Sequence, residues 1–281
     1  MTESSIATLV QMDRVSKIYT SGFLTKKTVP TVKNVSFEIR RGETLGLVGE
    51  SGCGKTTIGR ILLMLAKPTE GTIRFDGIDL TQLSRNDLRS IRPRMQILFQ
   101  DPDTSLNPRM NIRDSITEPM EIWGTGDSGS RARRIAELME LVGLQPELAA
   151  RYPWELSGGQ KQRAVLARVL ALNPEFLVAD EPTSALDLSV QAQVLSLLKE
   201  MQRSRNLTML FISHDLSVVR VMSDRIAVMY RGEIVEIAAT EDLFRDPVHP
   251  YTRELVEAER RTESELSCRS PRSGELDENT I

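Results

Sequence analysis

The chain has 281 residues, of which 40% are hydrophobic and 27% charged, with a formal net charge of −3 and a pI near 5.7. These values are typical of a globular protein with one sizeable core, and the acidic balance argues against a general nucleic-acid-binding protein. Two cysteines are too few for a disulfide framework or a cysteine-based zinc site, and they favour a reducing, cytosolic compartment. No apolar run approaches the roughly 20 residues that are needed to span a bilayer. The N-terminus lacks the pattern of a signal peptide.

The first hundred residues alternate between predicted strands and one predicted helix. Alternating or continuous apolar residues predict strands at Ile6–Tyr19, Asn34–Ile39, Thr44–Val48, Thr72–Phe75 and Met95–Phe99. Helical spacing predicts a helix over Lys55–Ala66. The polar segments between them, Ser21–Thr31 and Lys67–Gly71, contain glycine and proline and are typical of loops.

The rest of the chain continues the alternation after a helical stretch. Asp101–Pro119 is typical of loop and short helix, and helices are predicted at Arg131–Val142, Gln160–Leu172 and Ser189–Arg203. Strands are predicted at Phe176–Ala179 and Leu207–Ile212, followed by a hairpin of Arg225–Tyr230 and Glu233–Ile237. This pattern predicts an α/β sheet with a helical lobe inserted near residues 100–170. The polar segment Arg260–Ile281 is typical of a mostly disordered tail.

A glycine-rich segment, Gly49–Thr56, fits the phosphate-loop pattern G-x-x-x-x-G-K-[ST] between an apolar strand and a helix. Its glycines allow backbone N–H groups to surround a phosphate at a helix N-terminus. Lys55 is then expected on the β- and γ-phosphates and the Thr56 hydroxyl on Mg²⁺. The alternative, a plain glycine-rich turn with a surface lysine, does not explain the flanking strand and helix. Cys53 is interpreted as a small space-filling residue.

An acid pair, Asp180 and Glu181, ends the apolar strand that begins at Phe176. Because parallel strands present their functional groups at their carboxyl ends, we expect Asp180 to hold Mg²⁺ and Glu181 to accept a proton from the attacking water. The alternative is that one of these acids caps the next helix. That alternative loses weight in a chain that also carries a phosphate loop.

A third segment, Leu156–Gln160, combines a serine and two glycines before a predicted helix. It predicts a second anion-binding helix N-terminus. A serine N-cap with a flexible turn explains the same residues, and the local chemistry leaves both interpretations open.

In the chain order Gly49–Thr56, Leu156–Gln160 and Asp180–Glu181, these three segments resemble those of the ABC transporter ATPases, and the resemblance covers about Leu9 to Ala258. The resemblance implies a P-loop NTPase core with a mixed sheet, an N-terminal antiparallel β subdomain and an inserted α-helical subdomain. It divides the chain into an ATPase domain at 6–258, with a helical subdomain at about 100–170, and a polar tail at 259–281. It also implies ATP and Mg²⁺ as cofactors.

The resemblance assigns roles to individual residues. In this interpretation Tyr19 stacks on adenine. The other nucleotide-binding residues are Gly49, Glu50, Ser51, Gly52, Cys53, Gly54, Lys55, Thr56 and Thr57. The signature motif that faces the ATP of a second subunit is Leu156, Ser157, Gly158, Gly159 and Gln160. The D-loop is Ser184, Ala185, Leu186 and Asp187. The catalytic residues are Glu181, the switch histidine His214 and the Q-loop glutamine Gln100, and the metal ligands are Thr56, Gln100 and Asp180.

Three further segments are similar to the oligopeptide, dipeptide and nickel importer branch of these ATPases: Phe99–Met110, Arg151–Leu156 and Pro247–Arg253. Trp154 stands where that branch more often carries histidine. Cys268 is the only cysteine in the sequence after Ala258. Some relatives carry an iron–sulfur cluster in this region, and one cysteine cannot support such a cluster. The resemblance is therefore closer to the cluster-free member of the usual unequal pair.

The resemblance implies an ATPase that powers an importer, most readily for peptides, with nickel, metal chelates or sugars as other solutes of the branch. Its partners are permease subunits on other chains, a second ATPase subunit, either a copy or a related chain, in a head-to-tail dimer, and indirectly an extracellular or periplasmic solute-binding protein. It places the chain on the cytoplasmic face of the cell membrane. The segment Asp103–Met110 is the candidate surface for the permease.

Two other classes compete with the importer. A soluble ABC ATPase acting in translation carries two cassettes on one chain, and chromosome-organising relatives insert very long coiled coils, whereas this sequence has one phosphate loop and no such insertion. An exporter ATPase is disfavoured by the segments at 99–110 and 247–253. Arg131, Arg133 and Arg134 are interpreted as the solvated face of a helix and not as a nucleic-acid surface.

Overall fold

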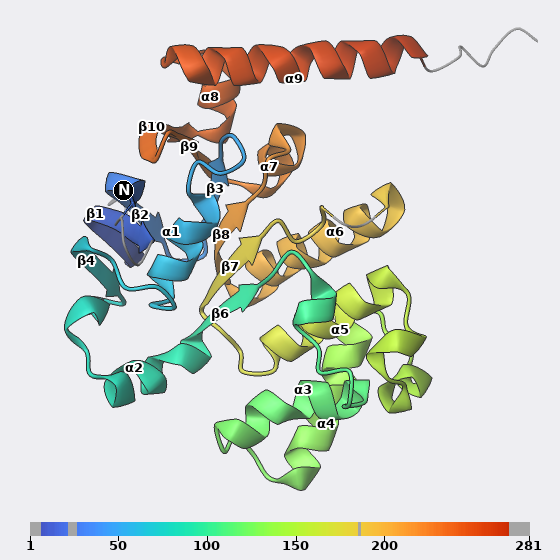
Figure 1. Ribbon diagram of the computed structural model, residues 1–281. Helices are drawn as coiled ribbons and strands as arrows, with labels where there is room; N and C mark the ends of the chain where they lie inside the picture. The colour runs from blue at the N-terminus through green and yellow to red at the C-terminus, as the bar shows by residue number, and fades with distance from the viewer. Residues whose placement is uncertain (1–6, 22–26, 185–186, 270–281) are drawn as a thin grey trace, which may run out of the picture.

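The computed structural model describes residues 7–21, 27–184 and 187–269, which form two sheets and a helical lobe (Figure 1). The predicted D-loop residues Ala185 and Leu186, and the end of the predicted tail at 270–281, lie outside the described residues. Within the part of the chain that the structure describes, no helix is both long enough and apolar enough to cross a membrane.

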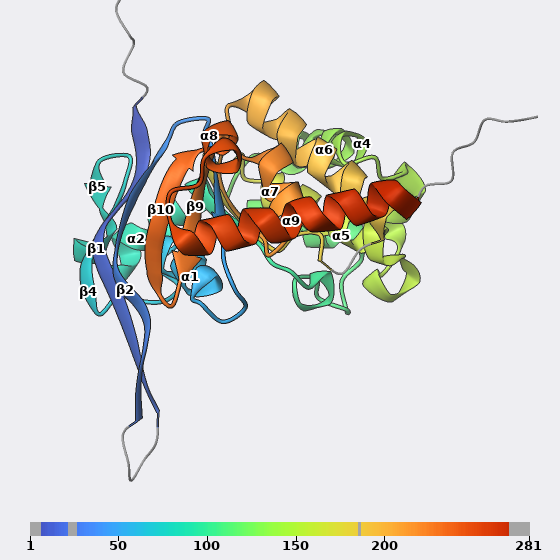
Figure 2. The ribbon, with the colours of Figure 1, turned by 90° about the horizontal axis from the view of Figure 1, so that it is seen from above.

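The first sheet is antiparallel and lies at the N-terminal side of the molecule. Its strand order is β2-β1-β4-β5, with β1 at Thr8–Ser21, β2 at Lys27–Arg40, β4 at Glu70–Phe75 and β5 at Ile78–Asp79. The predicted N-terminal antiparallel β subdomain is thereby confirmed. Strand β2 begins earlier than the predicted Asn34, because its first residues pair with the end of β1, as in Tyr19 opposite Val29. The two strands form a hairpin that projects from the body (Figure 2).

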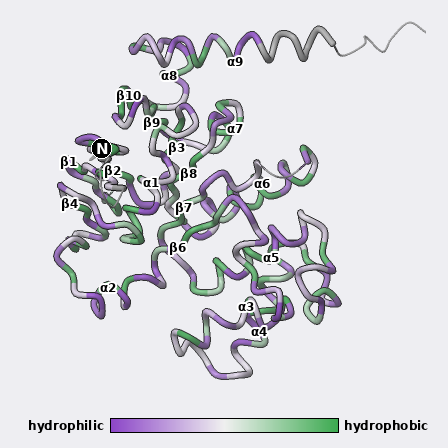
Figure 3. The backbone as a smooth tube through the Cα atoms, viewed as in Figure 1, coloured by the Kyte–Doolittle hydropathy of each residue, from purple (hydrophilic) through white to green (hydrophobic). Residues whose placement is uncertain are grey.

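The second sheet is mixed and carries the centre of the molecule. Its order is β10-β9-β3-β8-β7-β6, parallel from β9 to β6 and antiparallel between β10 and β9. The bounds are β3 Thr44–Val48, β6 Met95–Leu98, β7 Phe176–Asp180, β8 Thr208–Ile212, β9 Arg225–Tyr230 and β10 Glu233–Ala239. Every residue of β3, β7 and β8 is buried, and Figure 3 shows their hydrophobic character. Such strands require cover on both faces.

Helices surround this sheet and build the inserted lobe. They are α1 Lys55–Leu62, α2 Arg85–Ile91, α3 Ile112–Ile122, α4 Ser128–Leu141, α5 Gly158–Leu170, α6 Leu188–Arg205, α7 Leu216–Met222, α8 Thr240–Arg245 and α9 Pro250–Arg269. Between β6 and β7, the chain forms α3, α4 and α5, which pack through fully buried residues such as Ile116, Leu138 and Leu166. This lobe lies at the bottom of Figure 1.

The predicted disordered tail is wrong as far as Arg269, because α9 continues through this segment. The prediction relied on polarity alone. Residues 251–269 contain no glycine or proline and are rich in glutamate and arginine, which favour helix. Glu257 and Arg261 form an ion pair at 3.8 Å one turn apart. Val256, 1% exposed, anchors the first half of the helix in the core.

Candidate active site

The glycine-rich loop leaves the carboxyl end of β3 and enters α1 at Lys55. Gly49 and Gly54 have φ angles of +150° and +115°. A Cβ on Gly49 would lie 2.1 Å from the Met229 carbonyl oxygen, and one on Gly54 would lie 2.6 Å from that of Thr31. The loop therefore needs glycine at both positions to lie this close to its neighbours.

Lys55 carries a buried positive charge within this loop. Its side chain is 6% exposed, and Nζ donates to the carbonyl oxygens of Gly49 at 2.7 Å and Glu50 at 3.0 Å. The ammonium group and the first-turn amides of α1 thus converge on one place. That combination attracts a multiply charged anion such as a phosphate chain.

Thr56 and Asp180 bring two hard oxygen atoms together beside the loop. The Thr56 hydroxyl donates to Asp180 Oδ1 at 3.1 Å across a sequence separation of 124 residues. Burial raises the pKa of Asp180, and the neighbouring charge of Glu181 raises it further, although the hydroxyl of Thr56 lowers it. A divalent cation would relieve this unfavourable charge, and hydroxyl and carboxylate oxygens are ligands that Mg²⁺ accepts. The residues present therefore fit a magnesium ion.

Glu181 and His214 lie beside this pair at the ends of two adjacent strands. Glu181 follows β7, its amide donates to the Ile212 carbonyl at 2.9 Å, and its Oε2 lies 3.3 Å from His214 Nδ1. The backbone of Glu181 has φ +49°, a left-handed conformation that is unusual for this residue type. The fold thus holds an acid and an imidazole in contact at the sheet edge where the phosphate loop begins.

Gln100 follows β6 at the same edge of the sheet. Leu98, two residues earlier, pairs with Ala179, which lies two residues before Glu181. The side chain of Gln100 is exposed. Asp101 then begins a 3₁₀ turn, Pro102–Thr104, by accepting the amide of Asp103.

Cys53 lies buried in the glycine-rich loop at 8% exposure. Burial raises the pKa of its thiol, so the protonated form, which is a poor nucleophile, prevails near neutral pH. This is consistent with a space-filling role. Of the remaining residues predicted to bind nucleotide, Ser51 and Gly52 lie in this loop and Thr57 lies in the first turn of α1.

The segment Leu156–Gln160 lies on the inserted lobe, at the start of α5 (Figure 1). Ser157 is the N-cap of α5: its Oγ accepts the Gln160 amide at 3.3 Å, and Gln160 Oε1 accepts the Ser157 amide at 3.0 Å. Leu156 is buried, whereas Ser157 and Gly158 are exposed. The serine-cap interpretation is therefore correct as local structure, and the helix N-terminus it caps faces solvent.

A link that the sequence did not predict joins α5 to the acid pair. Gln162, fully buried, donates from Nε2 to the Pro182 carbonyl at 2.7 Å, directly after Glu181. A long-range pairing of this kind has no local sequence signal. Near it, Ser184 donates to the Glu181 carbonyl at 3.2 Å and Asp187 caps α6 through the Val190 amide at 3.0 Å.

Tyr19 lies on the projecting hairpin and is 42% exposed. The ammonium group of Lys17 lies 4.9 Å from the centre of its ring. The ring therefore offers an exposed aromatic surface.

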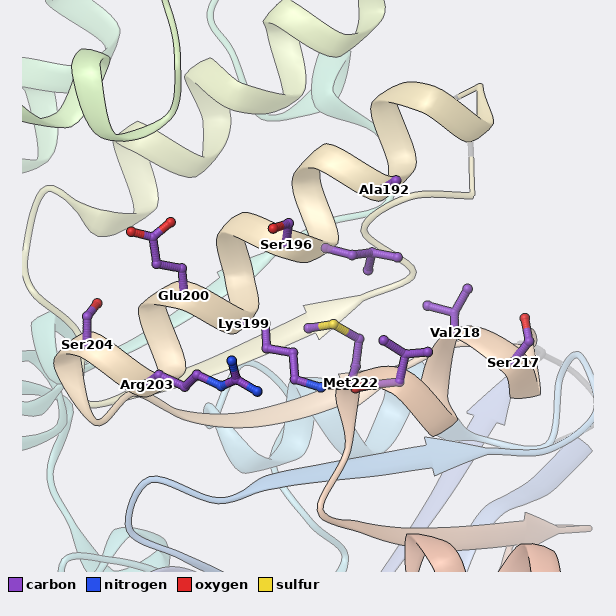
Figure 4. A pocket seen from close by; sticks show the side chains of 11 residues that line it. Ala192, Ser196, Lys199, Glu200, Arg203, Ser204, Ser217, Val218 and Met222 are labelled. Carbon is purple, nitrogen blue, oxygen red and sulfur yellow. Dashed lines mark hydrogen bonds between the residues drawn. The ribbon is translucent and has the colours of Figure 1, made fainter.

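A groove of about 760 Å³ lies elsewhere, between α6 and α7. Figure 4 shows Lys199 and Arg203 of α6, and Val218 and Met222 of α7, among the side chains that line it. The predicted site residues among the described part of the chain do not line it. It is therefore separate from the site at the sheet edge.

The glycine-rich loop, the buried lysine and the paired hydroxyl and carboxylate define a P-loop nucleotide-binding protein. Comparison with known proteins carries this further: the ABC transporter family matches residues 32–184. The chain belongs to the ABC transporter family, and it is an ATP-binding ATPase.

Two curated relatives and one solved structure are similar to most of this chain. It is 54% identical over 82% of its length to the putative oligopeptide transport ATP-binding protein YkfD of Bacillus subtilis, covering 70% of that protein. It is 49% identical over 91% of its length to the oligopeptide transport ATP-binding protein AppF of Bacillus subtilis, covering 79%. The dimeric ATP-binding cassette MJ0796, bound to ADP and phosphate, has a TM-score of 0.75 and 31% identity, covering 83% of this chain and 99% of that one.

Proposed function

We propose that this chain is the ATP-hydrolysing subunit that powers a peptide importer whose permease subunits are separate chains. The observation that carries the ATPase part is the contact of Thr56 with Asp180 beside the Glu181–His214 pair. The peptide part is supported by relatives that are named oligopeptide transport ATP-binding proteins. The ATPase domain corresponds to residues 6–258.

In this proposal Mg²⁺ is held by Thr56, Asp180 and Gln100. The ion supplies positive charge that neutralises the phosphate oxygens. The buried position of Asp180 and its contact with Thr56 support the first two ligands. The position of Gln100 after β6, next to β7, supports the third.

The chain's own residues then bind the triphosphate and activate water. Lys55 and the amides of Gly49–Thr57 bind the phosphates, and Tyr19 stacks on adenine. Glu181 accepts the proton of the attacking water at its carboxylate. His214, in contact with that carboxylate at 3.3 Å, orients it and contacts the γ-phosphate.

A second ATPase subunit completes each site in this proposal. The exposed N-terminus of α5, formed by Leu156–Gln160, faces the ATP of the second subunit, and Ser184 and Asp187 lie beside the junction. A lone subunit would leave this anion-binding helix end without a ligand. The dimeric state of the similar MJ0796 cassette supports a dimer.

The permease subunits contact the segment Asp103–Met110, and an extracellular or periplasmic solute-binding protein delivers the peptide. This arrangement attaches the chain to the cytoplasmic face of the membrane through its partners.

The test is Glu181→Gln in the full-length chain, expressed with and without the permease and paired ATPase chains. Because the variant keeps the shape of the side chain but loses its basicity, ATP binding should persist, turnover should fall by at least about a hundredfold, and ATP should trap closed dimers. Nucleotide-dependent association, ATP turnover and uptake of a labelled oligopeptide into vesicles are the measurements. Persistent turnover would remove Glu181 as the base, and failure of ATP to promote association would remove the two-subunit site.

A further inference from the structure

The segment that follows the core, Pro247–Arg253, returns to the nucleotide-binding loop. Tyr251, in the first turn of α9, accepts the backbone N–H of Glu50 with its hydroxyl oxygen at 3.0 Å, across 201 residues of sequence. Tyr251 is 7% exposed. In Figure 1, α8 and α9 lie over the ends of β10, β9 and β3. The nucleotide-binding loop emerges from β3.

The hydrogen-bonded group is a sensitive point of the loop. The N–H of Glu50 belongs to the same planar peptide group as the carbonyl of Gly49, and this carbonyl accepts Lys55 Nζ at 2.7 Å. The carbonyl of Glu50 itself accepts Lys55 Nζ at 3.0 Å and the amide of Cys53 at 3.3 Å. Fixing the N–H of Glu50 therefore fixes the carbonyl of Gly49, which is one of the two acceptors that hold the lysine.

Tyr251 is itself held firmly in place. Its ring packs against that of Tyr230, with the centres 4.3 Å apart, and its amide donates to His249 Nδ1 at 3.2 Å. The carboxylate of Glu236 on β10 accepts the amides of Val248 at 3.0 Å and His249 at 2.9 Å. A chain of contacts thus runs from β10 through the segment to the loop.

We propose that Tyr251 is a positioning residue for the nucleotide-binding loop, through which the segment after the core sets the affinity for ATP. This inference rests on the proposed role of Gly49–Thr57 in ATP binding. The hydroxyl preorganises the peptide group between Gly49 and Glu50, so the loop does not have to order this group when the phosphates bind.

The same helix also contacts the other side of the site. Val256 of α9 is fully buried in the cluster that contains Leu216 and Val219 of α7, the helix that follows His214. The segment after the core is therefore packed against elements on both sides of the candidate site.

The experiment compares Tyr251→Phe with the wild-type full-length chain, measuring the Kd for ATP in Mg²⁺ by calorimetry together with KM and kcat. Loss of one ordinary hydrogen bond should raise Kd and KM by about three- to tenfold while kcat stays within twofold. Tyr230→Phe is the matched control, since it removes a neighbouring hydroxyl with no hydrogen bond among the described residues. An unchanged Kd in Tyr251→Phe, or an equal loss in Tyr230→Phe, would overturn the proposal.

A double-mutant cycle adds a readout that a general loss of stability would not give. Glu236→Gln removes one acceptor from the segment and should weaken ATP binding through the displaced tyrosine. In the double variant with Tyr251→Phe, the two losses should be clearly less than additive, whereas full additivity would argue against a shared route. Lys55→Ala separates the two levels. If this variant binds ATP as tightly as the wild-type chain, the loop assignment fails and the role of Tyr251 fails with it. If Lys55→Ala weakens ATP binding while Tyr251→Phe leaves Kd unchanged, only the role of Tyr251 fails.

Discussion

The signature segment has two adjacent glycines with very different surroundings. A Cβ on Gly159 would lie 2.6 Å from Val190 Cγ1 and 3.1 Å from its Cγ2, at the start of α6, whereas a Cβ on Gly158 would meet no atom within 4 Å. Valine is stiff about its first side-chain torsion and cannot turn aside easily. Gly159 is therefore required where α5 and α6 meet, independently of any ligand.

Gly159→Ala should consequently lower the free energy of unfolding of the isolated chain by about 1–3 kcal/mol through overpacking. Urea unfolding without nucleotide measures this effect. Gly158→Ala is the matched control and should leave stability unchanged within about 0.5 kcal/mol. Equal losses in the two variants would show that the contact with Val190 does not limit stability.

At the scale of single residues, the sequence predicted the contacts that follow from motif spacing and sheet geometry. The approach of Thr56 to Asp180, and of His214 to Glu181, follows because parallel strands end at one edge. The left-handed backbone of Glu181 and the contact between Tyr251 and Glu50 were not predictable, because they depend on packing between distant segments.

At the scale of elements, four charged side chains join the two sheets. Arg41 follows β2 and Asp76 follows β4, while Arg94 and Glu175 precede β6 and β7. Arg41 pairs with Glu175 at 3.0 Å and Arg94 with Asp76 at 2.6 Å, and each arginine also contacts the other acid. Hydrogen bonds from Arg94, and then from Arg41, lower the pKa of both Asp76 and Glu175.

Glu175→Gln should therefore destabilise the chain near pH 7 by about 1 kcal/mol, a modest figure because the side chains are about one-third exposed. Since the folded-state pKa of the carboxyl is lowered, its contribution is complete above the unfolded value near 4.3 and is lost as pH falls through the folded value. The difference from wild type should thus shrink below about pH 4.

Urea unfolding of both proteins between about pH 3 and 7 measures this difference. Glu257→Gln serves as the control, because its ion pair with Arg261 is far more exposed, and it should change stability little at any pH. A difference between Glu175→Gln and wild type that stays constant down to pH 3 would exclude the electrostatic explanation.

The sequence predicted most of the strongly apolar elements and missed the short helices together with α9. Strand β3 was predicted with its observed bounds because it is a continuous apolar run next to a glycine. Helices α2, α7 and α8 have only seven, seven and six residues, too few to show a helical period. Helix α9 was missed because polarity was read as disorder although its residues favour helix.

At the scale of the whole molecule, the fold separates the two helix ends that we propose to bind anions. The N-terminus of α1 lies at the edge of the central sheet, whereas that of α5 lies on the inserted lobe. The α/β class and the inserted lobe were predictable from the alternation of elements. The packing of the segment after the core onto the nucleotide-binding loop was not, since it joins segments that are distant in sequence.

The lobe also carries the surface proposed to receive the permease. Arg109 is exposed in the segment between the 3₁₀ turn Pro102–Thr104 and α3. Asp103, within this 3₁₀ turn, pairs with Lys161 of α5 at 2.6 Å. Force applied by a permease at this segment would thus reach the helix that begins with the signature residues.

Arg109→Glu should therefore uncouple the assembled importer: peptide uptake should fall at least about tenfold because the reversed charge weakens docking, while the Kd for ATP of the full-length chain stays within twofold. Uptake into vesicles and calorimetric ATP binding are measured on the same preparations. Arg133→Glu, an equal charge reversal on the exposed face of α4, is the control and should leave uptake intact. An equal loss of ATP binding in Arg109→Glu would mean that the segment supports the nucleotide site and not the permease contact, because the charge reversal would then act within the chain itself.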